Sequence, residues 1–397
     1  MGEGPVRKRR VFYVSGFDPR GVAVYHRMFC EESQKQAARS GVSVQAGQRK
    51  RDGPLASVWQ AERAVDGGAV ETTFEFMHWD DIARRHWHAG YARLYVLAFK
   101  TYWYWVVVSD FLARRILRIS KWNFITGIAP AIVLFLLPPL AVLAGWVGYS
   151  LGKAVTTQFA WLPVLLAAAG FAAVIGIAWW LERFFSLGWL LRTYGFVLDY
   201  SLGRVPELDE RMARFAERIT SYLKTSDDDE ILVVGHSVGA NVAVSVLARA
   251  LAINPRLCRD YRPVGLLTLG GSIPMQGLLP WSQVFRDELA TLASNGGLAW
   301  VDVSAPQDVA SFAMLNPVTA SGVAVDGMAP QRPLVVAGAF REMLSPETYA
   351  TASWDMFRMH FQYLMASELE QERIQDYLSV TTGGLTFRDR FGMPGDS

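Results

Sequence analysis

The chain has 397 residues, a formal net charge of +2 and 51% hydrophobic residues. Because the charge is nearly neutral and no Lys/Arg stripe recurs with stacking aromatic residues, we expect no nucleic-acid partner. The apolar content is high for a soluble protein and indicates a membrane segment, while the length suits one large domain with an insertion or two modest domains. The two cysteines, Cys30 and Cys258, form no CxxC pair, so we expect free thiols in a reducing compartment.

The N-terminal region has the pattern of a strand, a helix and a second strand. Met1 to Arg10 is basic, but the short apolar run after it lacks the long apolar core of a signal peptide. The predicted elements are strands at 11–14 and 72–77, a helix at 24–39, and a connecting loop at 41–68 with a short strand near 42–44. This order predicts the start of a parallel α/β sheet.

Residues 82–205 differ sharply in composition from the flanking sequence, and we predict that they form a helical membrane insertion. Residues 91–119 are rich in aromatic side chains and are interrupted by Lys100 and Asp110, which is typical of a helix lying at the membrane interface. The stretch at 184–202 is again aromatic with few charges, and we interpret it as a possible lid over the domain.

Two long uncharged stretches predict two transmembrane helices. Residues 122–152 contain no charged residue over 31 positions and residues 154–181 none over 28. About 20 apolar residues suffice to cross a bilayer core. The predicted helices are at about 128–149 and 159–180, joined by a short linker at 150–158. Pro138 and Pro139 should kink or break the first of them.

Positive charges lie on both outer flanks of this predicted hairpin. The linker carries only Lys153, whereas the outer flanks carry Arg114, Arg115, Arg118, Lys121, Arg183, Arg192 and Arg204. The positive-inside rule therefore predicts that both flanks, and with them the α/β domain, lie on the cytoplasmic side of the membrane. In a bacterium this would be the inner, or plasma, membrane.

After the insertion, residues 231–239 form a run of branched apolar residues that ends in Gly-His-Ser-Val-Gly. The apolar run predicts a buried strand and residues 240–251 predict a helix, so Ser237 falls on the turn between them. A sharp strand-to-helix turn pushes one side chain out of the sheet, and Gly235 and Gly239 leave room for the neighbouring strand and helix. This context favours Ser237 as a nucleophile.

The remaining chain resumes the alternation of strands and helices. The predicted elements are helices at 208–222 and 282–293, strands at 264–269, 298–303 and 334–337, a mostly helical region at 346–377, and a polar, Gly-rich tail at 381–397. Repeated strand-helix units on both sides of the insertion predict one doubly wound, mostly parallel sheet, formed jointly by residues 10–80 and 206–380.

A serine nucleophile needs a base within hydrogen-bond reach and an acid that orients the base. Only one of the six histidines, His360, follows Ser237, as the base does in this strand-turn-helix arrangement. For the acid, a position just beyond the predicted strand 298–303 favours Asp308. The alternatives are Asp302, inside that strand, and the outside candidates Asp326 and Asp355. His86 and His88 resemble a metal pair only weakly, so we expect neither a metal nor a cofactor.

Acyl transfer also requires backbone N–H groups that stabilise the oxyanion. One donor should be Val238, the residue after the nucleophile, and the other should come from the loop after the first strand, at Gly16 and Phe17. Gly16 would let the backbone approach the substrate closely.

Together, the Gly-His-Ser-Val-Gly turn, the later Asp308 and the last His360 resemble the α/β-hydrolase superfamily. The resemblance covers residues 10–80 and 206–380 and leaves out 82–205. It implies an α/β-hydrolase-type sheet in which Ser237, Asp308 and His360 are nucleophile, acid and base, and Gly16, Phe17 and Val238 form the oxyanion hole. The loop Ser15-Gly16-Phe17-Asp18 departs from the His-Gly opening that is common in lipases.

We therefore expect a membrane-anchored serine hydrolase that cleaves an ester-linked lipid or another apolar acyl substrate, with the lipid bilayer as its partner. One alternative is a membrane acyltransferase that uses the same three residues. A second alternative, from another class, is a non-catalytic hydrolase fold that binds lipid or serves as a scaffold.

Overall fold

The computed structural model describes residues 5–65, 68–88, 90–109, 112–156, 158–324, 332–369 and 373–394. The chain divides into two compact units. The first unit comprises Met1–Trp87, Phe196–Ser353 and Arg358–Ser397, and the second comprises His88–Gly195 with Trp354–Phe357. The second unit is thus inserted, in sequence, into the first.

The first unit is an α/β structure built on a mostly parallel, mixed sheet. The strand order is β2-β4-β5-β1-β6-β7-β8-β9, with β3 also paired to β4. The strands are β1 (Lys8–Val14), β2 (Val44–Ala46), β3 (Lys50–Asp52), β4 (Ala56–Val65), β5 (Gly68–Met77), β6 (Glu230–His236), β7 (Val264–Leu269), β8 (Leu298–Ser304) and β9 (Leu334–Ala337). β1 pairs in parallel with both β5 and β6, so the sheet joins the two halves of the sequence.

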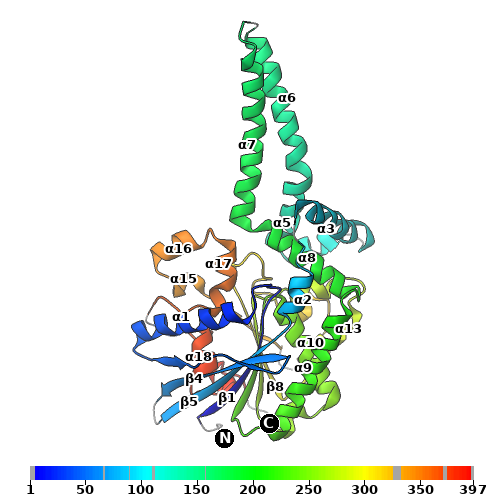
Figure 1. Cartoon of the computed structure of the whole chain (residues 1–397). Coiled ribbons are helices and arrows are strands. Elements are labelled where there is room, and N and C mark those ends of the chain that lie inside the picture. Colours follow the sequence, from blue (N-terminus) through cyan, green and yellow to red (C-terminus); the bar gives the residue numbers. More distant parts are fainter. Residues whose placement is uncertain are drawn as a thin grey trace. The chain divides into compact units, whose positions relative to one another are not determined.

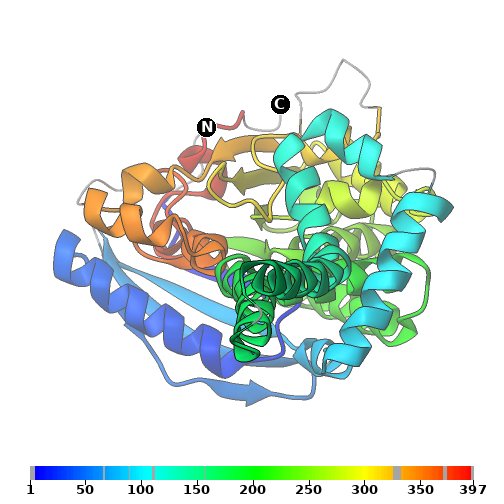
Figure 2. The ribbon, with the colours of Figure 1, turned by 90° about the horizontal axis from the view of Figure 1, so that it is seen from above.

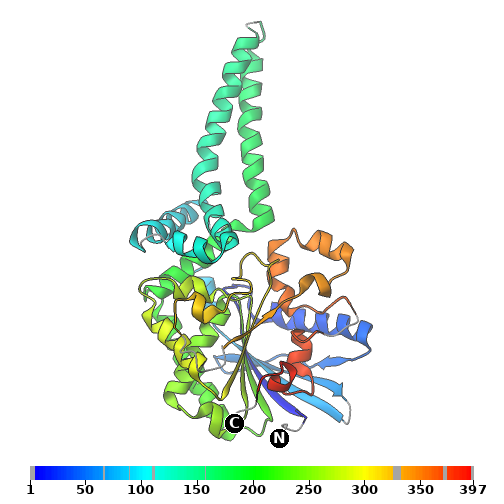
Figure 3. The same cartoon turned by 180° about the vertical axis from the view of Figure 1, so that it is seen from behind.

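Helices cover both faces of this sheet. On one face, α10 (Val238–Ile253) packs against β1, β6 and β7 and against α9 (Pro206–Thr225) and α13 (Gln283–Ser294). On the other, α18 (Tyr377–Thr382) packs against β1, β4 and β5. Figure 1 shows α1 (Val22–Ser40) on the same side as α18, and Figure 3 shows the two layers from behind. Because the parallel strands are covered on both faces, β6 and β8 are buried along their whole length.

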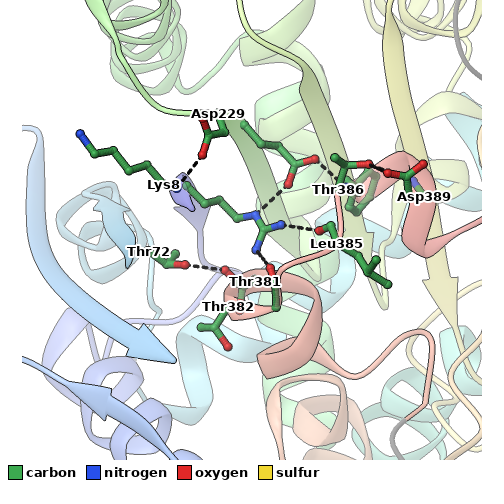
Figure 4. A network of polar contacts seen from close by, with 12 residues as sticks. Lys8, Thr72, Asp229, Thr381, Thr382, Leu385, Thr386 and Asp389 are labelled. Carbon is green, nitrogen blue, oxygen red and sulfur yellow. Dashed lines mark hydrogen bonds and ion pairs between the residues drawn. The ribbon is translucent and has the colours of Figure 1, made fainter. Parts of the chain in front are cut away.

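The end of the chain is packed into the first unit rather than forming the polar tail that the sequence predicts. Arg9, at the start of β1, is fully buried and donates to Glu230 (2.7 Å) and to the carbonyls of Gly383 (2.7 Å) and Leu385 (2.8 Å). Glu230 in turn accepts from the backbone N–H of Phe387 at 2.5 Å. Figure 4 shows this network, with Thr72 also donating to the carbonyl of Thr381. A buried ion pair is tolerated when such hydrogen bonds complete it.

The second unit is entirely helical in its described residues. Its helices are α3 (Tyr91–Trp103), η1 (Tyr104–Val108), α4 (Leu112–Ile119), α5 (Lys121–Ala131), η2 (Ile132–Leu136), α6 (Leu137–Val155), α7 (Trp161–Phe185) and the first part of α8 (Leu187–Ser201). The helix predicted at 91–119 is therefore broken, because the π-helical turn η1 separates α3 from α4. The segment predicted as a possible lid corresponds to α8.

Two helical stretches are long and apolar enough to span a membrane. They are Lys121–Val155 and Trp161–Phe185, with mean hydropathies of 2.3 and 2.2. Only 17% of the most apolar window of the first and none of the second is buried, whereas a core helix of a soluble protein is mostly buried. Helix α6 continues to Val155, which makes the linker between the two stretches shorter than predicted.

Helices α6 and α7 lie side by side in every view (Figures 1, 2 and 3). Glycines make this close approach possible. A Cβ at Gly148 would lie 2.3 Å from the Leu166 carbonyl oxygen, and one at Gly152 would lie 2.5 Å from the Cα of Pro163. Small residues at such contacts are typical of helices that pack in a membrane, where close van der Waals contact replaces the hydrophobic effect.

Of the kink or break predicted at Pro138 and Pro139, the break does not occur, because the first apolar stretch stays helical through both prolines. They lie in the first turn of α6, directly after the π-helical turn η2. In η2 the N–H of Leu137 donates to the carbonyl of Ile132, five residues back. The wider turn accommodates the proline rings, which lack an N–H and clash with an ordinary preceding turn.

One other prediction was wrong, and one was correct only in outline. The loop predicted at 41–68 contains β4, a ten-residue strand antiparallel to β5. The region predicted as mostly helical at 346–377 is divided into the short helices α16 (Pro346–Ala352), α17 (Met356–Phe361) and η3 (Gln362–Leu364), and it ends at the start of α18. In the first unit, the other strands and helices that were predicted lie within a few residues of their predicted positions.

Candidate active site

Ser237 lies on the turn between β6 and α10 in a strained conformation. Its backbone φ is 58° and its ψ is −129°, a conformation that residues other than glycine rarely adopt. A Cβ at Gly235 would lie 2.5 Å from the carbonyl oxygen of Gly239, and one at Gly239 would lie 2.2 Å from that of Val14. Both positions therefore require glycine, and the strained turn is fixed by the backbone packed around it.

Asp308 and His360 form a buried pair in the same unit. The Nδ1 atom of His360 lies 2.9 Å from Asp308 Oδ2, and each residue is 1% exposed. The second oxygen, Oδ1, accepts from the backbone N–H of Ala310 at 3.1 Å. Asp308 follows β8, and His360 lies in α17, so two segments bring together residues that are 52 positions apart. The carboxylate can hold the imidazole in one tautomer and orientation, with Nε2 on the other side of the ring.

The His360 backbone is tied to the residue before Ser237. His236 donates from Nε2 to the carbonyl oxygen of His360 at 2.8 Å, and the two rings have centroids 4.9 Å apart. Burial lowers the pKa of His236 to about 3, so its ring is neutral and carries its hydrogen on Nε2. His236 therefore anchors α17 to the turn between β6 and α10 and brings His360 into the neighbourhood of Ser237.

The other acidic candidates are placed differently. Asp302 lies inside β8, where its Oδ1 accepts from the hydroxyl of Thr268 on β7 at 2.5 Å. Burial raises the pKa of Asp302 to about 7. Asp355 is exposed and belongs to the second unit, and Asp326 lies outside the described residues. Among the described candidates, the structure thus brings Asp308, and not Asp302, against His360.

The predicted oxyanion loop lies directly over Ser237. A Cβ at Gly16 would lie 2.9 Å from the Cβ and 3.4 Å from the Oγ of Ser237. Val238 is the first residue of α10, where an amide has no acceptor within its own helix. Neither Val238 nor Phe17 donates its backbone N–H to another residue in the described part of the chain. Both amides can therefore serve a substrate oxygen.

The loop that contains Gly16 and Phe17 is held on both sides. The indole N–H of Trp79 donates to the carbonyl of Ser15 at 2.9 Å, and the ring of Phe17 stacks on Phe196 with centroids 4.3 Å apart. Downstream, Asp18 accepts from the Arg20 guanidinium at 2.7 Å and from the Tyr25 hydroxyl at 3.0 Å. Such preorganisation is what an oxyanion hole needs, because its donors must be in place before charge develops.

A second series of contacting Ser, His and Asp side chains lies next to this loop, and the sequence did not predict it. Ser57 Oγ lies 2.9 Å from His78 Nε2, and His78 Nδ1 lies 3.1 Å from Asp80 Oδ1. Arg84 then bonds both Asp80 (2.6 Å) and the carbonyl of Pro19 (3.1 Å). Although burial alone raises it, hydrogen bonds from His78 and Arg84 hold the pKa of Asp80 below its usual range.

Ser57 does not have the setting of a nucleophile. It is 4% exposed and lies within the antiparallel strand β4, opposite Phe76, rather than on a strained turn. The chain of contacts instead ends at the loop beside Gly16, so we interpret it as a support for that loop. A Ser57 and His78 pair could be suspected from sequence only if β4 were recognised, because Ser57 lies on β4 and His78 directly follows its neighbour β5.

Two further residues contact the Asp308 and His360 pair. The hydroxyl of Tyr363 lies 3.1 Å from Asp308 Oδ2 and accepts from the backbone N–H of Ala305 at 2.9 Å. Burial, and then the nearby Asp308, raise the pKa of Tyr363 well above its usual value. Gly270, after β7, has a φ of 53°, and a Cβ there would lie 2.5 Å from the Tyr363 ring. No pattern in the sequence around Tyr363 points to this contact.

Within the described residues, no group of three or more His, Cys, Asp and Glu side chains is arranged to hold a metal ion. His86 instead bonds Glu207 at 2.9 Å. Comparison of the chain with known protein families, with curated proteins and with solved structures found no match. Its chemistry therefore has to be argued from the geometry of Ser237, Asp308 and His360 alone.

Proposed function

We propose that the chain is a membrane-anchored serine hydrolase of the α/β-hydrolase type, which cleaves an ester-linked lipid or another apolar acyl substrate. The observation that carries the proposal is the buried pair of Asp308 and His360. Through His236, this pair is tied to the strained turn between β6 and α10 at Ser237. A strained serine, an imidazole oriented by a carboxylate and two available amides are the components of acyl transfer.

In the proposed mechanism, His360 takes the proton of the Ser237 hydroxyl while the serine oxygen attacks the ester carbonyl. The amides of Phe17 and Val238 stabilise the resulting oxyanion. His360 then gives its proton to the departing alcohol, and an acyl-enzyme remains on Ser237. Water, deprotonated by His360, then attacks this ester. His360 returns the proton to the departing Ser237 oxygen, which releases the carboxylic acid and restores the free serine. Asp308 stabilises the imidazolium at each of these steps.

The apolar stretches in the second unit support a substrate of lipid character. Lys121–Val155 and Trp161–Phe185 have the length and hydropathy of membrane spans, so the chain is expected to reside where long acyl esters are concentrated. Ser237 itself is only 6% exposed, so its side chain is largely shielded from water. An apolar substrate fits such a site, because a closed, dry site favours an acyl chain over water.

The test is labelling of the full chain by a fluorophosphonate probe, together with turnover of short-chain and long-chain esters. We expect the wild type to be labelled at Ser237 and to prefer long acyl chains, and Ser237→Ala to lose both properties. Release of free acid supports a hydrolase, whereas transfer of the acyl group to an added lipid alcohol would identify an acyltransferase. Wild-type protein that is neither labelled nor active on any ester would contradict the enzyme proposal and support a non-catalytic lipid-binding or scaffold protein.

The cytoplasmic orientation of the first unit is also a proposal, which rests on the flanking positive charges. A Cys30→Ser background leaves Cys258, which is buried, as the remaining thiol. In that background, a cysteine placed at Gln158, in the linker between α6 and α7, should react with an impermeant maleimide added outside intact cells. A cysteine placed at the exposed Lys224 should react only after the cells are opened. The reverse pattern would overturn the orientation.

A further inference from the structure

A cavity lies within the second unit, among the two apolar stretches and the helices that flank them. Its volume is about 510 Å³. Its walls come from α3, α5, η2, α6, α7 and α8, and the lining residues that matter here are Leu94, Leu134, Ala178, Trp179, Glu182 and Arg192. All of these residues belong to the second unit, so the cavity is a property of that unit alone.

One wall of the cavity is an irregular helix. Pro130 and Pro138 lie on either side of the π-helical turn η2, and both line the cavity. The carbonyl of Leu134 would accept from residue 138 in an α-helix or from residue 139 in a π-helix. Both residues are prolines and have no N–H to donate. Helices with such local irregularities are tolerated within membrane proteins where they line a cavity.

Two opposite charges meet at one part of this otherwise apolar lining. Glu182, at the end of α7, accepts from the backbone N–H of Gly188 at 3.0 Å, and Arg192, on α8, donates to the carbonyl of His88 at 2.7 Å. A Cβ at Gly188 would lie 2.9 Å from Glu182 Oε1 and 3.0 Å from Arg192 Nη1. Gly188 thus lets the carboxylate and the guanidinium converge. Burial lowers the pKa of Arg192, although the guanidinium stays charged.

We propose that this cavity binds one acyl chain of a zwitterionic glycerophospholipid, with the phosphate on Arg192 and the headgroup ammonium towards Glu182. The apolar side chains match an acyl chain, and a guanidinium is suited to a phosphate. A free fatty acid fits less well, because its carboxylate would be repelled by Glu182 while the cavity offers only one cation. The location between apolar helices also places the site where such a lipid is abundant.

The proposal is independent of the hydrolase chemistry, so binding is measured on the full-length Ser237→Ala protein. The protein is stripped of lipid in detergent and titrated with palmitoyl-oleoyl phosphatidylethanolamine, and bound lipid is counted by native mass spectrometry. We expect one lipid that binds more tightly than the rest. Ala178→Trp fills the cavity and should weaken this binding at least tenfold. Ala173→Trp, an exposed position on the same helix that does not line the cavity, should leave the affinity within twofold.

The headgroup contact is tested with Arg192→Gln, and its matched control is Arg183→Gln, an exposed arginine that does not line the cavity. Arg192→Gln should weaken binding of the phospholipid about tenfold, while Arg183→Gln should not. Monopalmitoylglycerol, which has an acyl chain but no phosphate, should bind equally to wild type and Arg192→Gln, which shows that the variant is folded. It should bind poorly to Ala178→Trp. Equal phospholipid affinity in Ala178→Trp and Ala173→Trp would overturn the proposal.

Discussion

The hydroxyl of Tyr363 donates to Asp308 Oδ2 at 3.1 Å, the same oxygen that lies 2.9 Å from His360 Nδ1. The carboxylate therefore shares its charge between a neutral donor and the imidazole. This makes Tyr363 a positioning residue for the proposed acid, since it touches Asp308 and not the reacting serine.

Tyr363→Phe should lower ester turnover several-fold and shift its pH dependence. Without the hydroxyl, more of the carboxylate charge faces the imidazole and favours its protonated form, which cannot act as a base. We expect the acidic limb of the pH–rate profile to move to higher pH. The variant should also lose about 1–3 kcal/mol of stability, because the buried N–H of Ala305 loses its acceptor. A variant that is less stable but has an unchanged pH profile would reduce Tyr363 to a structural role.

The two acidic candidates should respond very differently to amide substitution. Asp308→Asn should reduce turnover on the order of 10⁴-fold, the size of effect found when an amide replaces the acid of a serine–histidine relay. Asp302→Asn should leave turnover nearly unchanged, because its oxygen bonds Thr268. The measurement is kcat/KM for one ester across the three proteins at equal concentration of labelled Ser237. A larger loss in Asp302→Asn than in Asp308→Asn would contradict the assignment of the acid.

Asp302 should instead control how stability depends on pH. Its folded pKa of about 7 lies above its unfolded value, so the folded state holds a proton that the unfolded state releases. This contribution to the free energy of unfolding is fully present below about pH 4 and is lost as the pH rises towards 7. Asp302→Asn should therefore raise the melting temperature at pH 8 relative to wild type.

His236 acts in the opposite direction, since its folded pKa of about 3 lies below its unfolded value of 6.5. Its contribution is complete above about pH 6.5 and is lost as the pH falls towards 3. In wild type the two groups oppose each other between about pH 4 and 6.5. Once Asp302→Asn removes one of them, melting temperatures should decline steadily with acidification across that window. A pH dependence identical to wild type would contradict the contribution of Asp302, and a flat profile for Asp302→Asn across this window would contradict that of His236.

Gly16→Ala should interfere with Ser237 directly. The new methyl group would lie 2.9 Å from the Ser237 Cβ, so we expect a large loss of fluorophosphonate labelling as well as a loss of stability. The clash requires the serine side chain. In a Ser237→Gly background the same substitution should therefore cost about 1 kcal/mol less than in wild type, as measured by a double-mutant cycle on unfolding. If Gly16→Ala lowered the free energy of unfolding equally in both backgrounds, the clash would not involve the Ser237 side chain.

Gly239→Ala should destabilise the first unit on the order of 3 kcal/mol, because its Cβ would lie 2.2 Å from the Val14 carbonyl and 2.4 Å from that of Ser15. These are backbone atoms at the end of β1 and just after it, and they cannot rotate away. Gly176→Ala is the matched control, a helical glycine whose Cβ would meet nothing within 4 Å. Thermal melting followed by tryptophan fluorescence should show a lower midpoint for Gly239→Ala only.

The elements that the sequence predicted well are those with one dominant signal. The runs around Val233, Leu267 and Val301 are apolar on both faces because the parallel strands are buried on both faces. β4 was missed because its inward-facing positions include Arg63, which is buried and bonds Ser379 at 3.0 Å. A charged residue at a core position hides the alternation of polar and apolar residues that marks a half-buried strand.

For the candidate site, chain order led to Ser237, Asp308 and His360 because each residue type is scarce or constrained at its place. The partners that hold these residues could not be derived in that way. Tyr363, Gly270 and Trp79 act through contacts between segments that lie far apart in sequence, and nothing in their own neighbourhoods signals the contact. The continuous helix through Pro138 likewise depends on a π-helical turn that no local pattern predicts.

The buried Arg9 network sets an order on how the chain is assembled. Arg9 is synthesised well before its partner, because it bonds a carbonyl 374 residues later. β1 therefore has no complete set of partners until residues 383–387 have been synthesised, whereas α6 and α7 are adjacent in sequence and can pair early. The apolar hairpin is thus available to the insertion machinery while the sheet is still open. The first unit closes last, in the proposed membrane protein on a chain that is already anchored, and a chain truncated before Gly383 should remain in that unfinished state because it lacks both carbonyl acceptors of Arg9.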